Sequence, residues 1–144
     1  MNNYKFRGKT AGKWVYGFLL KNIDGKCAIL DEDNTVNFNY LSYSIVKPVN
    51  FNYLSYSIVN PETVGQWTGK GDANKKDLYA DEIVLNKLTG KMGVIIWIES
   101  AAGFFIKDIK NNTFFDAWEL LDESSIVSIG NIHDNPEILE DSKC

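Results

Sequence analysis

The stretch that decides the fold runs from residue 82 to residue 132 and contains five short apolar segments: EIVLN (82–86), GVIIWIE (93–99), FFIKDI (104–109), FFDAW (114–118) and IVSIGNI (126–132). Their β-branched and aromatic residues, separated by turn signals such as Thr89-Gly90 and Asn111-Asn112, predict strands. This number and spacing of strands predicts a small five-strand barrel, SH3-like or similar, with few open edges. After the last strand, Pro136 is expected to be the first residue of a helical turn.

Towards the amino terminus, the segment Trp14–Leu20 alternates large apolar residues in the way that a strand does. Cys27–Leu30 is its expected partner across the Asp24-Gly25 turn, with Cys27 as a small core residue. The sequence therefore predicts a mainly β protein with two lobes. Residues 1–77 form the first, which ends in a Gly- and Lys-rich loop (65–76), and residues 78–144 form the second, which ends in an acidic tail.

A tandem repeat occupies the middle of the first lobe. Residues 36–48 read VNFNYLSYSIVKP and residues 49–61 read VNFNYLSYSIVNP, so only Lys47 and Asn60 differ. Because the period of 13 is odd, one continuous strand would place the two copies on opposite faces. A turn at Pro48 is expected, which leaves either a hairpin of the two copies or one copy in the sheet and the other looped out. Competition for one sheet position also predicts register exchange or a domain-swapped dimer.

Composition excludes several classes of protein. With 44% hydrophobic residues the 144-residue chain is not wholly disordered, and its longest uncharged apolar run, around Val94–Ile98, is far shorter than the ~20 residues of a membrane span. Two cysteines and no signal-like segment predict a cytoplasmic protein without a membrane partner. A net charge of −4 disfavours a nucleic-acid partner, although six cationic residues precede residue 27.

Residue chemistry predicts no catalytic, metal or cofactor site. His133 is the only histidine and follows a predicted strand, where a nucleophile and an orienting group are not evident. Two distant cysteines and one histidine lack the paired spacing of zinc ligands. Carboxylates such as Asp81, Glu82, Glu99 and Asp116 show no spacing that singles out a catalytic pair.

Several blocks, in order, resemble the YopX family of phage and prophage proteins: KFRGK (5–9) with WVYG (14–17), PETVGQWTG (61–69), LY (78–79) with IV (83–84), and IGNI (129–132) with NPE (135–137). The resemblance implies a mainly β protein encoded by a bacteriophage or prophage, in a family without an established activity, and so supplies no catalytic residues. The chain departs from the family pattern at three places. Trp67 replaces a Tyr, Asn74-Lys75 replaces an Asn-Gly turn, which is expected to change type, and Ala80-Asp81 replaces Glu-Gly.

The family-signature positions have two interpretations; they are Trp14, Gly17, Gln66, Trp67, Thr68, Gly69, Tyr79, Gly130 and Asn131. In the structural one, glycines hold special backbone positions, and aromatic residues including Trp14 and Tyr16 fill a core between the lobes. In the functional one, Gln66, Thr68 and Tyr79 line a groove at the lobe junction.

Three function classes remain. The first is a non-enzymatic phage accessory protein that binds a host or phage protein or forms a homo-oligomer. The alternative is a nucleic-acid-binding module that uses the basic amino-terminal stretch with Phe6, Trp14 and Tyr16. An enzyme is the third and least supported class, because no catalytic constellation is evident.

Overall fold

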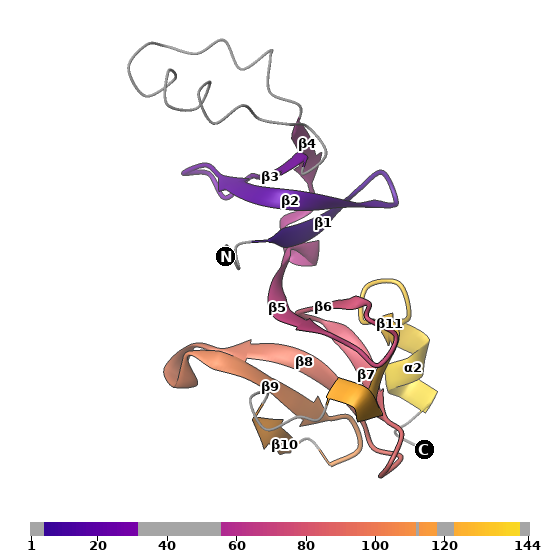
Figure 1. Ribbon diagram of the computed structural model, residues 1–144. Coiled ribbons are helices and arrows are strands. Elements are labelled where there is room, and N and C mark those ends of the chain that lie inside the picture. Colours follow the sequence, from indigo (N-terminus) through magenta and orange to yellow (C-terminus); the bar gives the residue numbers. More distant parts are fainter. Residues whose placement is uncertain (1–4, 32–55, 112, 118–122, 142–144) are drawn as a thin grey trace. The chain divides into compact units, whose positions relative to one another are not determined.

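The computed structural model describes residues 5–31, 56–111, 113–117 and 123–141 (Figure 1). The chain forms two compact units, Asn2–Val64 and Gly65–Cys144. Both are built mainly of antiparallel strands, as predicted. The first copy of the tandem repeat, and the second copy up to residue 55, lie outside the described residues.

The N-terminal unit contains four described strands: β1 (Phe6–Thr10), β2 (Lys13–Lys21), β3 (Cys27–Asp31) and β4 (Tyr56–Val59). They pair in the order β4-β3-β2-β1, and a 3-10 turn, η2 (Pro61–Thr63), follows β4. The predicted pairing of the second and third strands is confirmed. β4 comes from the second copy of the repeat, so this copy supplies a strand of the sheet.

One face of this sheet forms the core of the N-terminal unit. Cys27, Ile29 and Val59 are buried there, as predicted for Cys27, and four partly buried side chains pack against them: Phe6, Val15, Leu19 and Val64. Gly8 is required by close packing, because a Cβ atom at this position would lie 2.8 Å from Cγ2 of Val59. β1 and β4 therefore meet across the core face at a point where no larger residue fits.

The C-terminal unit begins with a hairpin of β5 (Gly65–Gly71) and β6 (Asp77–Tyr79). Five more strands follow: β7 (Glu82–Asn86), β8 (Met92–Ile98), β9 (Gly103–Asp108), β10 (Phe114–Ala117) and β11 (Ile126–Asn131). Two 3-10 turns, η3 (Glu99–Ala101) and η5 (Glu123–Ser125), precede β9 and β11. The helix α2 (Pro136–Asp141) begins at Pro136, as predicted.

The five predicted strands of this unit are confirmed to within one residue at each end, but the barrel is not closed. They form one antiparallel sheet in the order β10-β9-β8-β7-β11, whose end strands β10 and β11 do not pair with one another within the described residues. Its core contains the buried side chains Leu78, Val84, Ile95, Ile106 and Ile126. The expected five-strand barrel is therefore an open sheet.

The boundary between the units lies at residues 64 and 65 and not at residues 77 and 78. The expected loop 65–76 contains β5, which pairs with β6 at Trp67 and Tyr79. The Thr68 hydroxyl donates a 2.8 Å hydrogen bond to the Leu78 carbonyl, and Leu78 is in the core of the C-terminal unit. Because β5 has glycines instead of alternating apolar residues, the sequence pattern conceals the strand.

Candidate functional site

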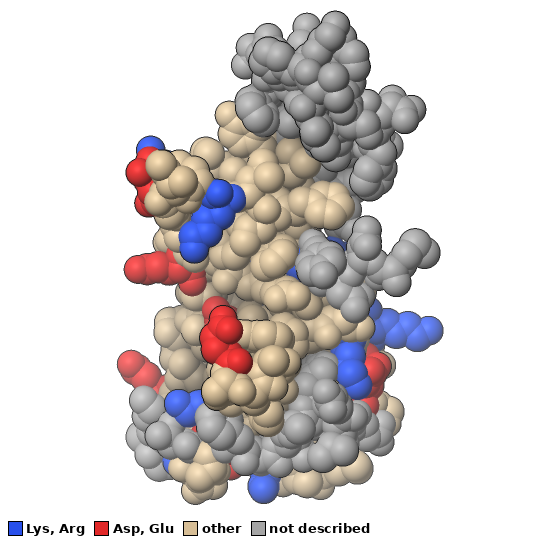
Figure 2. Space-filling view, turned by 90° about the vertical axis from the view of Figure 1, so that its left-hand side faces the viewer, with Lys and Arg blue, Asp and Glu red and all other residues tan. Residues whose placement is uncertain are grey.

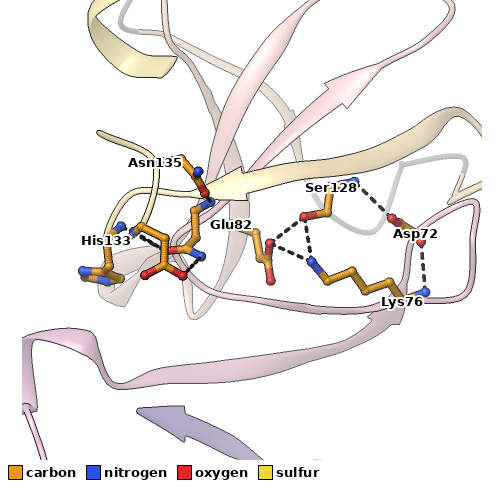
Figure 3. Close-up of polar contacts among 8 residues, drawn as sticks. Asp72, Lys76, Glu82, Ser128, His133 and Asn135 are labelled. Atoms are coloured by element: carbon orange, nitrogen blue, oxygen red, sulfur yellow. Dashed lines mark hydrogen bonds and ion pairs between the residues drawn. The ribbon is translucent and has the colours of Figure 1, made fainter. Parts of the chain in front are cut away.

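The first candidate site is a polar cluster at the β5–β6 turn of the C-terminal unit (Figure 3). Asp72 Oδ1 accepts hydrogen bonds from the backbone nitrogens of Asn74 (2.8 Å) and Lys76 (2.9 Å). Lys75 adopts a φ of +64°, so it takes the left-handed conformation that a glycine would take more easily. The Asp72 hydrogen bonds hold this turn with a lysine in the left-handed position, and the expected change of turn type stays a prediction.

Asp72 also joins the turn to β11. Its Oδ2 accepts a 3.0 Å hydrogen bond from the Ser128 backbone nitrogen, although the two residues are far apart in sequence. Burial raises the pKa of the Asp72 carboxyl, but the backbone hydrogen bonds from Ser128, Lys76 and Asn74, together with the Lys76 charge, outweigh burial and leave the pKa below its usual value. The carboxylate is thus a fixed acceptor that holds the turn.

Glu82, which is 1% exposed, lies in the middle of the cluster. The Ser128 hydroxyl donates a 2.7 Å hydrogen bond to Glu82 Oε2, while Lys76 Nζ donates to the Ser128 hydroxyl at 3.3 Å and lies 4.0 Å from Oε2. Serine beside lysine is a catalytic pair in some hydrolases. Here the serine proton goes to Glu82, and the Ser128 backbone nitrogen is bonded to Asp72. These contacts connect the β5–β6 turn to β7 and β11.

A second cluster joins the β6–β7 turn to the connection between β11 and α2. His133 Nε2 lies 3.0 Å from Asp81 Oδ2, and Asp81 has a φ of +72°. Asn131 Oδ1 accepts hydrogen bonds from the backbone nitrogens of His133 (3.0 Å) and Asp134 (2.9 Å). Asp81 occupies a left-handed position, which explains why a glycine, the residue implied by the family pattern, suits it. The pair His133–Asp81 and the Asn131 cap fix a loop.

Two predicted site residues, Gly130 and Asn131, belong to this loop. A Cβ atom on Gly130 would lie 2.5 Å from Asn135 Oδ1, which accepts a 3.2 Å hydrogen bond from the Asn131 backbone nitrogen. The Asn131 side chain donates to Asp134 Oδ2 at 3.1 Å. The structure therefore places both residues in the backbone architecture of the loop.

Five predicted site residues lie on the β5–β6 hairpin: Gln66, Trp67, Thr68, Gly69 and Tyr79. Trp67 Nε1 donates to the Lys70 carbonyl at 3.2 Å, and Gly69 has a φ of +85°. Tyr79 is 2% exposed. All five belong to the C-terminal unit, so Gln66, Thr68 and Tyr79 come from one lobe, and the groove that they would line stays a prediction.

The two remaining predicted residues, Trp14 and Gly17, lie on β2. The guanidinium carbon of Arg7 is 4.3 Å from the centroid of the Trp14 ring, and Lys9 Nζ is 5.5 Å from it. Val15 and Leu19 point to the core face, so the alternation of a strand places Trp14 and Tyr16 on the other face. Trp14 and Tyr16 therefore lie outside the core of the N-terminal unit, while the core between the lobes stays a prediction.

The opposite face of the N-terminal sheet exposes large apolar side chains. Phe18 lies opposite Leu30 and Leu30 opposite Tyr56, while Leu20 lies opposite Ala28 and Ala28 opposite Ile58. Residues that lie opposite one another share a face. We call the exposed members the apolar face: Tyr16 (39% exposed), Phe18 (44%), Leu20 (44%), Tyr56 (48%) and Ile58 (59%).

The sequence contained a signal for part of the apolar face. The alternation of Trp14, Tyr16, Phe18 and Leu20 identified one face of β2, but the other face is apolar as well, so the pattern alone did not show which face is buried. The β4 residues Tyr56 and Ile58 were missed, because only the register with β3 places them beside β2 residues.

The part of the chain that the structure describes lacks two further features. No group of three or more His, Cys, Asp or Glu side chains there could hold a metal ion. Among the same residues, no helix is long and apolar enough to cross a membrane.

Comparisons with known proteins agree with this architecture. Residues 5–140 match the family model described as YopX protein. The crystal structure of the YopX protein from Bacillus subtilis is similar to this chain with a TM-score of 0.50 at 16% sequence identity, and the alignment covers 94% of this chain and 98% of that one. At this identity the likeness concerns the fold alone. No curated protein matches the chain significantly.

Proposed function

Since the chain belongs to the YopX family, we propose that it is a phage- or prophage-encoded accessory protein, without enzymatic activity, that binds another protein through the apolar face of its N-terminal unit. The observation that carries the proposal is the exposure of Tyr16, Phe18, Leu20, Tyr56 and Ile58 on two strands of one sheet. Contiguous exposed apolar residues on a soluble domain are typical of protein-binding surfaces.

The composition of the apolar face suits a protein partner. Two of its five residues, Tyr16 and Phe18, are neighbours on one side of β2, and Tyr56 adds a third aromatic ring from β4. Aromatic residues are enriched at the buried centres of protein interfaces, because they bury a large area at a small cost in side-chain entropy. A partner with apolar side chains of its own would cover this surface.

The polar clusters of the C-terminal unit support a non-enzymatic protein. The Asp72, Glu82 and Ser128 side chains are engaged with one another or with the backbone, and His133 is paired with Asp81. Each of these contacts connects two loops or strands. These connections support structural roles for these side chains.

The basic amino-terminal stretch offers less support for nucleic-acid binding. Arg7 is 4% exposed and lies over the Trp14 ring, so this cation and this aromatic residue contact each other. Stacking platforms for bases require exposed rings in a basic groove. On the face shown in Figure 2, Lys and Arg side chains are scattered and do not gather into one patch.

The test compares the wild-type protein, tagged and recovered from phage-infected bacteria, with a Phe18→Asp, Ile58→Asp variant. Native mass spectrometry before and after nuclease treatment identifies what is bound. We expect a stoichiometric protein that survives nuclease and is lost in the variant, because each Asp would be buried without a partner in the interface.

The matched control is an Ile23→Asp, Leu88→Asp variant, which changes two exposed apolar residues (103% and 80%) outside the apolar face. It should retain the partner. Nuclease-sensitive mass would contradict the proposal in favour of nucleic-acid binding. Equal loss in both variants would show that the apolar face is not the binding surface.

A further inference from the structure

The edge of β3 pairs with a segment whose sequence occurs twice in the chain. β4 is Tyr56–Val59, and the first copy of the repeat contains the same four residues, YSIV, at 43–46. In the observed register Val59 lies opposite Cys27 and Ile58 lies opposite Ala28. Val46 and Ile45 would occupy these positions if the first copy paired with β3. Every side-chain contact that β4 makes from these four positions could therefore be made by the first copy.

The contacts that distinguish the copies lie just after the strand. Asn60 Oδ1 accepts a 3.1 Å hydrogen bond from the Glu62 backbone nitrogen and so caps η2. Thr63 Oγ1 accepts from the Lys9 backbone nitrogen at 2.8 Å and donates to the Asn60 carbonyl at 2.7 Å. The first copy has Lys47 in place of Asn60, followed by Pro48-Val49-Asn50. These hydrogen bonds stabilise the pairing of the second copy with β3.

We propose that the edge of β3 accepts residues 43–46 of the same chain in place of β4. In the alternative state the surplus 13 residues lie between the strand and η2, whereas in the observed state they lie between β3 and the strand. Tyr43 and Ile45 then replace Tyr56 and Ile58 on the apolar face. The sheet is thus preserved while the surplus segment moves from one end of the strand to the other.

Tethering favours exchange within one chain over exchange between two chains. A segment joined by a short flexible linker has an effective concentration in the ~mM range, which exceeds ordinary protein concentrations. The first copy also follows β3 more closely along the sequence than the second copy does, and loop-closure entropy favours the shorter connection slightly. The Asn60 and Thr63 contacts oppose this advantage, so the exchanged state is the minor one.

Cys27 provides a direct probe, because residues opposite one another in an antiparallel pair are close enough for a disulfide. The probe variants are Val46→Cys and Val59→Cys, each with Cys144→Ser, oxidised by glutathione disulfide at low protein concentration. Peptide mapping then identifies the disulfide. We expect Val59→Cys to cross-link to Cys27 efficiently and Val46→Cys to form the equivalent intramolecular disulfide more slowly.

The matched control is Ile45→Cys, which differs from Val46→Cys by one position in the same segment. Its counterpart Ile58 lies opposite Ala28 on the other face of the sheet, so pairing in the β4 register keeps it away from Cys27. We expect cross-linking of Val46→Cys to exceed that of Ile45→Cys about tenfold, since only one of them then faces Cys27. Equal rates would indicate random collision and would overturn the proposal, as would a disulfide between two chains.

A change outside the strand tests the balance between the copies. Thr63→Val removes the hydroxyl that bonds Lys9 and Asn60 but keeps the shape of the side chain. In this background, Val46→Cys should cross-link to Cys27 several times faster, while Val59→Cys should cross-link more slowly. Unchanged rates for both probes would show that β4 does not exchange.

Discussion

The two units of this protein differ in what they bury and what they expose. In the described residues of the C-terminal unit, the buried carboxylates Asp72, Glu82 and Asp108 accept hydrogen bonds from neighbouring turns and strands. The N-terminal sheet has a small core on one face and exposes five large apolar side chains on the other. A buried polar group is stable only when it is bonded, whereas an exposed apolar face remains available. The comparison teaches that these buried carboxylates of the C-terminal unit are bonded within it, and that the proposed partner surface lies on the N-terminal unit.

The largest expected difference in stability compares the same substitution, isoleucine to alanine, in the two units. Ile95 is 0% exposed in the C-terminal core, and Ile58 is 59% exposed on the apolar face. Ile95→Ala should lower the free energy of unfolding by about 3 kcal/mol, because it leaves a cavity. Ile58→Ala should lower it by less than about 1 kcal/mol, because the side chain already contacts water. Urea denaturation measures both, and equal losses would show that the apolar face is part of a core.

The second contrast concerns the polar cluster. Ser128→Ala removes the 2.7 Å hydrogen bond to Glu82 and leaves that carboxylate, which is 1% exposed, with one donor fewer. We expect a loss of about 2 kcal/mol in the free energy of unfolding, as for hydrogen bonds to buried charged groups. Ser100→Ala, at an exposed position in η3, is the control and should change stability by less than about 0.5 kcal/mol. If the two changes had similar effects on stability, the Ser128 hydroxyl would not stabilise the cluster.

The third prediction is an acid-dependent loss of stability in the C-terminal unit. Burial raises the pKa of Asp108, but hydrogen bonds from the Lys110 backbone, the Asn111 side chain and the Asn111 backbone, together with the Lys91 charge, lower it overall. The pKa of Asp72 is lowered as well. A carboxyl whose folded pKa lies below its unfolded value, about 3.9, stabilises the fold above that pH, and this contribution is lost as the pH falls through the folded pKa.

Thermal unfolding from pH 7 down into the acid range checks this prediction. Tm should fall as the pH drops below about 4. The Asp72→Asn and Asp108→Asn variants should be less stable than wild type at neutral pH, and their Tm should depend less on pH in the acid range. If the Tm of an Asp72→Asn, Asp108→Asn double variant fell with decreasing pH as steeply as that of wild type, the structural role of both carboxylates would be contradicted.

Much of the fold was predictable because the C-terminal strands have strong local signals. The segments at 82–86 and 126–132 combine β-branched residues with clear turn signals, and both form strands. β5 was missed because its glycines provide no apolar alternation. Barrel closure depends on whether the two end strands meet, which is a long-range property that strand number does not determine.

The candidate site was harder to predict than the fold. The sequence identified His133 and Asp81 separately, but only the paired turns bring their side chains to 3.0 Å. The same holds for Ser128 and Glu82, which lie on neighbouring strands. The alternation on β2 revealed an aromatic face, yet its exposure depends on which face packs against Val59 and Val64. The candidate site therefore depends on contacts between distant segments, which local sequence patterns do not reveal.

The smallest expected effect concerns the turn held by Asp72. Lys75 has a φ of +64°, which costs a residue with a side chain roughly 1–2 kcal/mol relative to glycine. Lys75→Gly removes this strain but gives the unfolded chain more freedom, which offsets about 0.4–1 kcal/mol. We therefore expect a net gain of about 0.5 kcal/mol, measured as a higher urea midpoint at unchanged m-value. Asn74→Gly, at the neighbouring position without a positive φ, is the control and should lower stability, because only the entropic term acts there. If both variants lost stability, the Asp72 hydrogen bonds would be holding Lys75 in its conformation without measurable strain, and the turn would depend on its lysine.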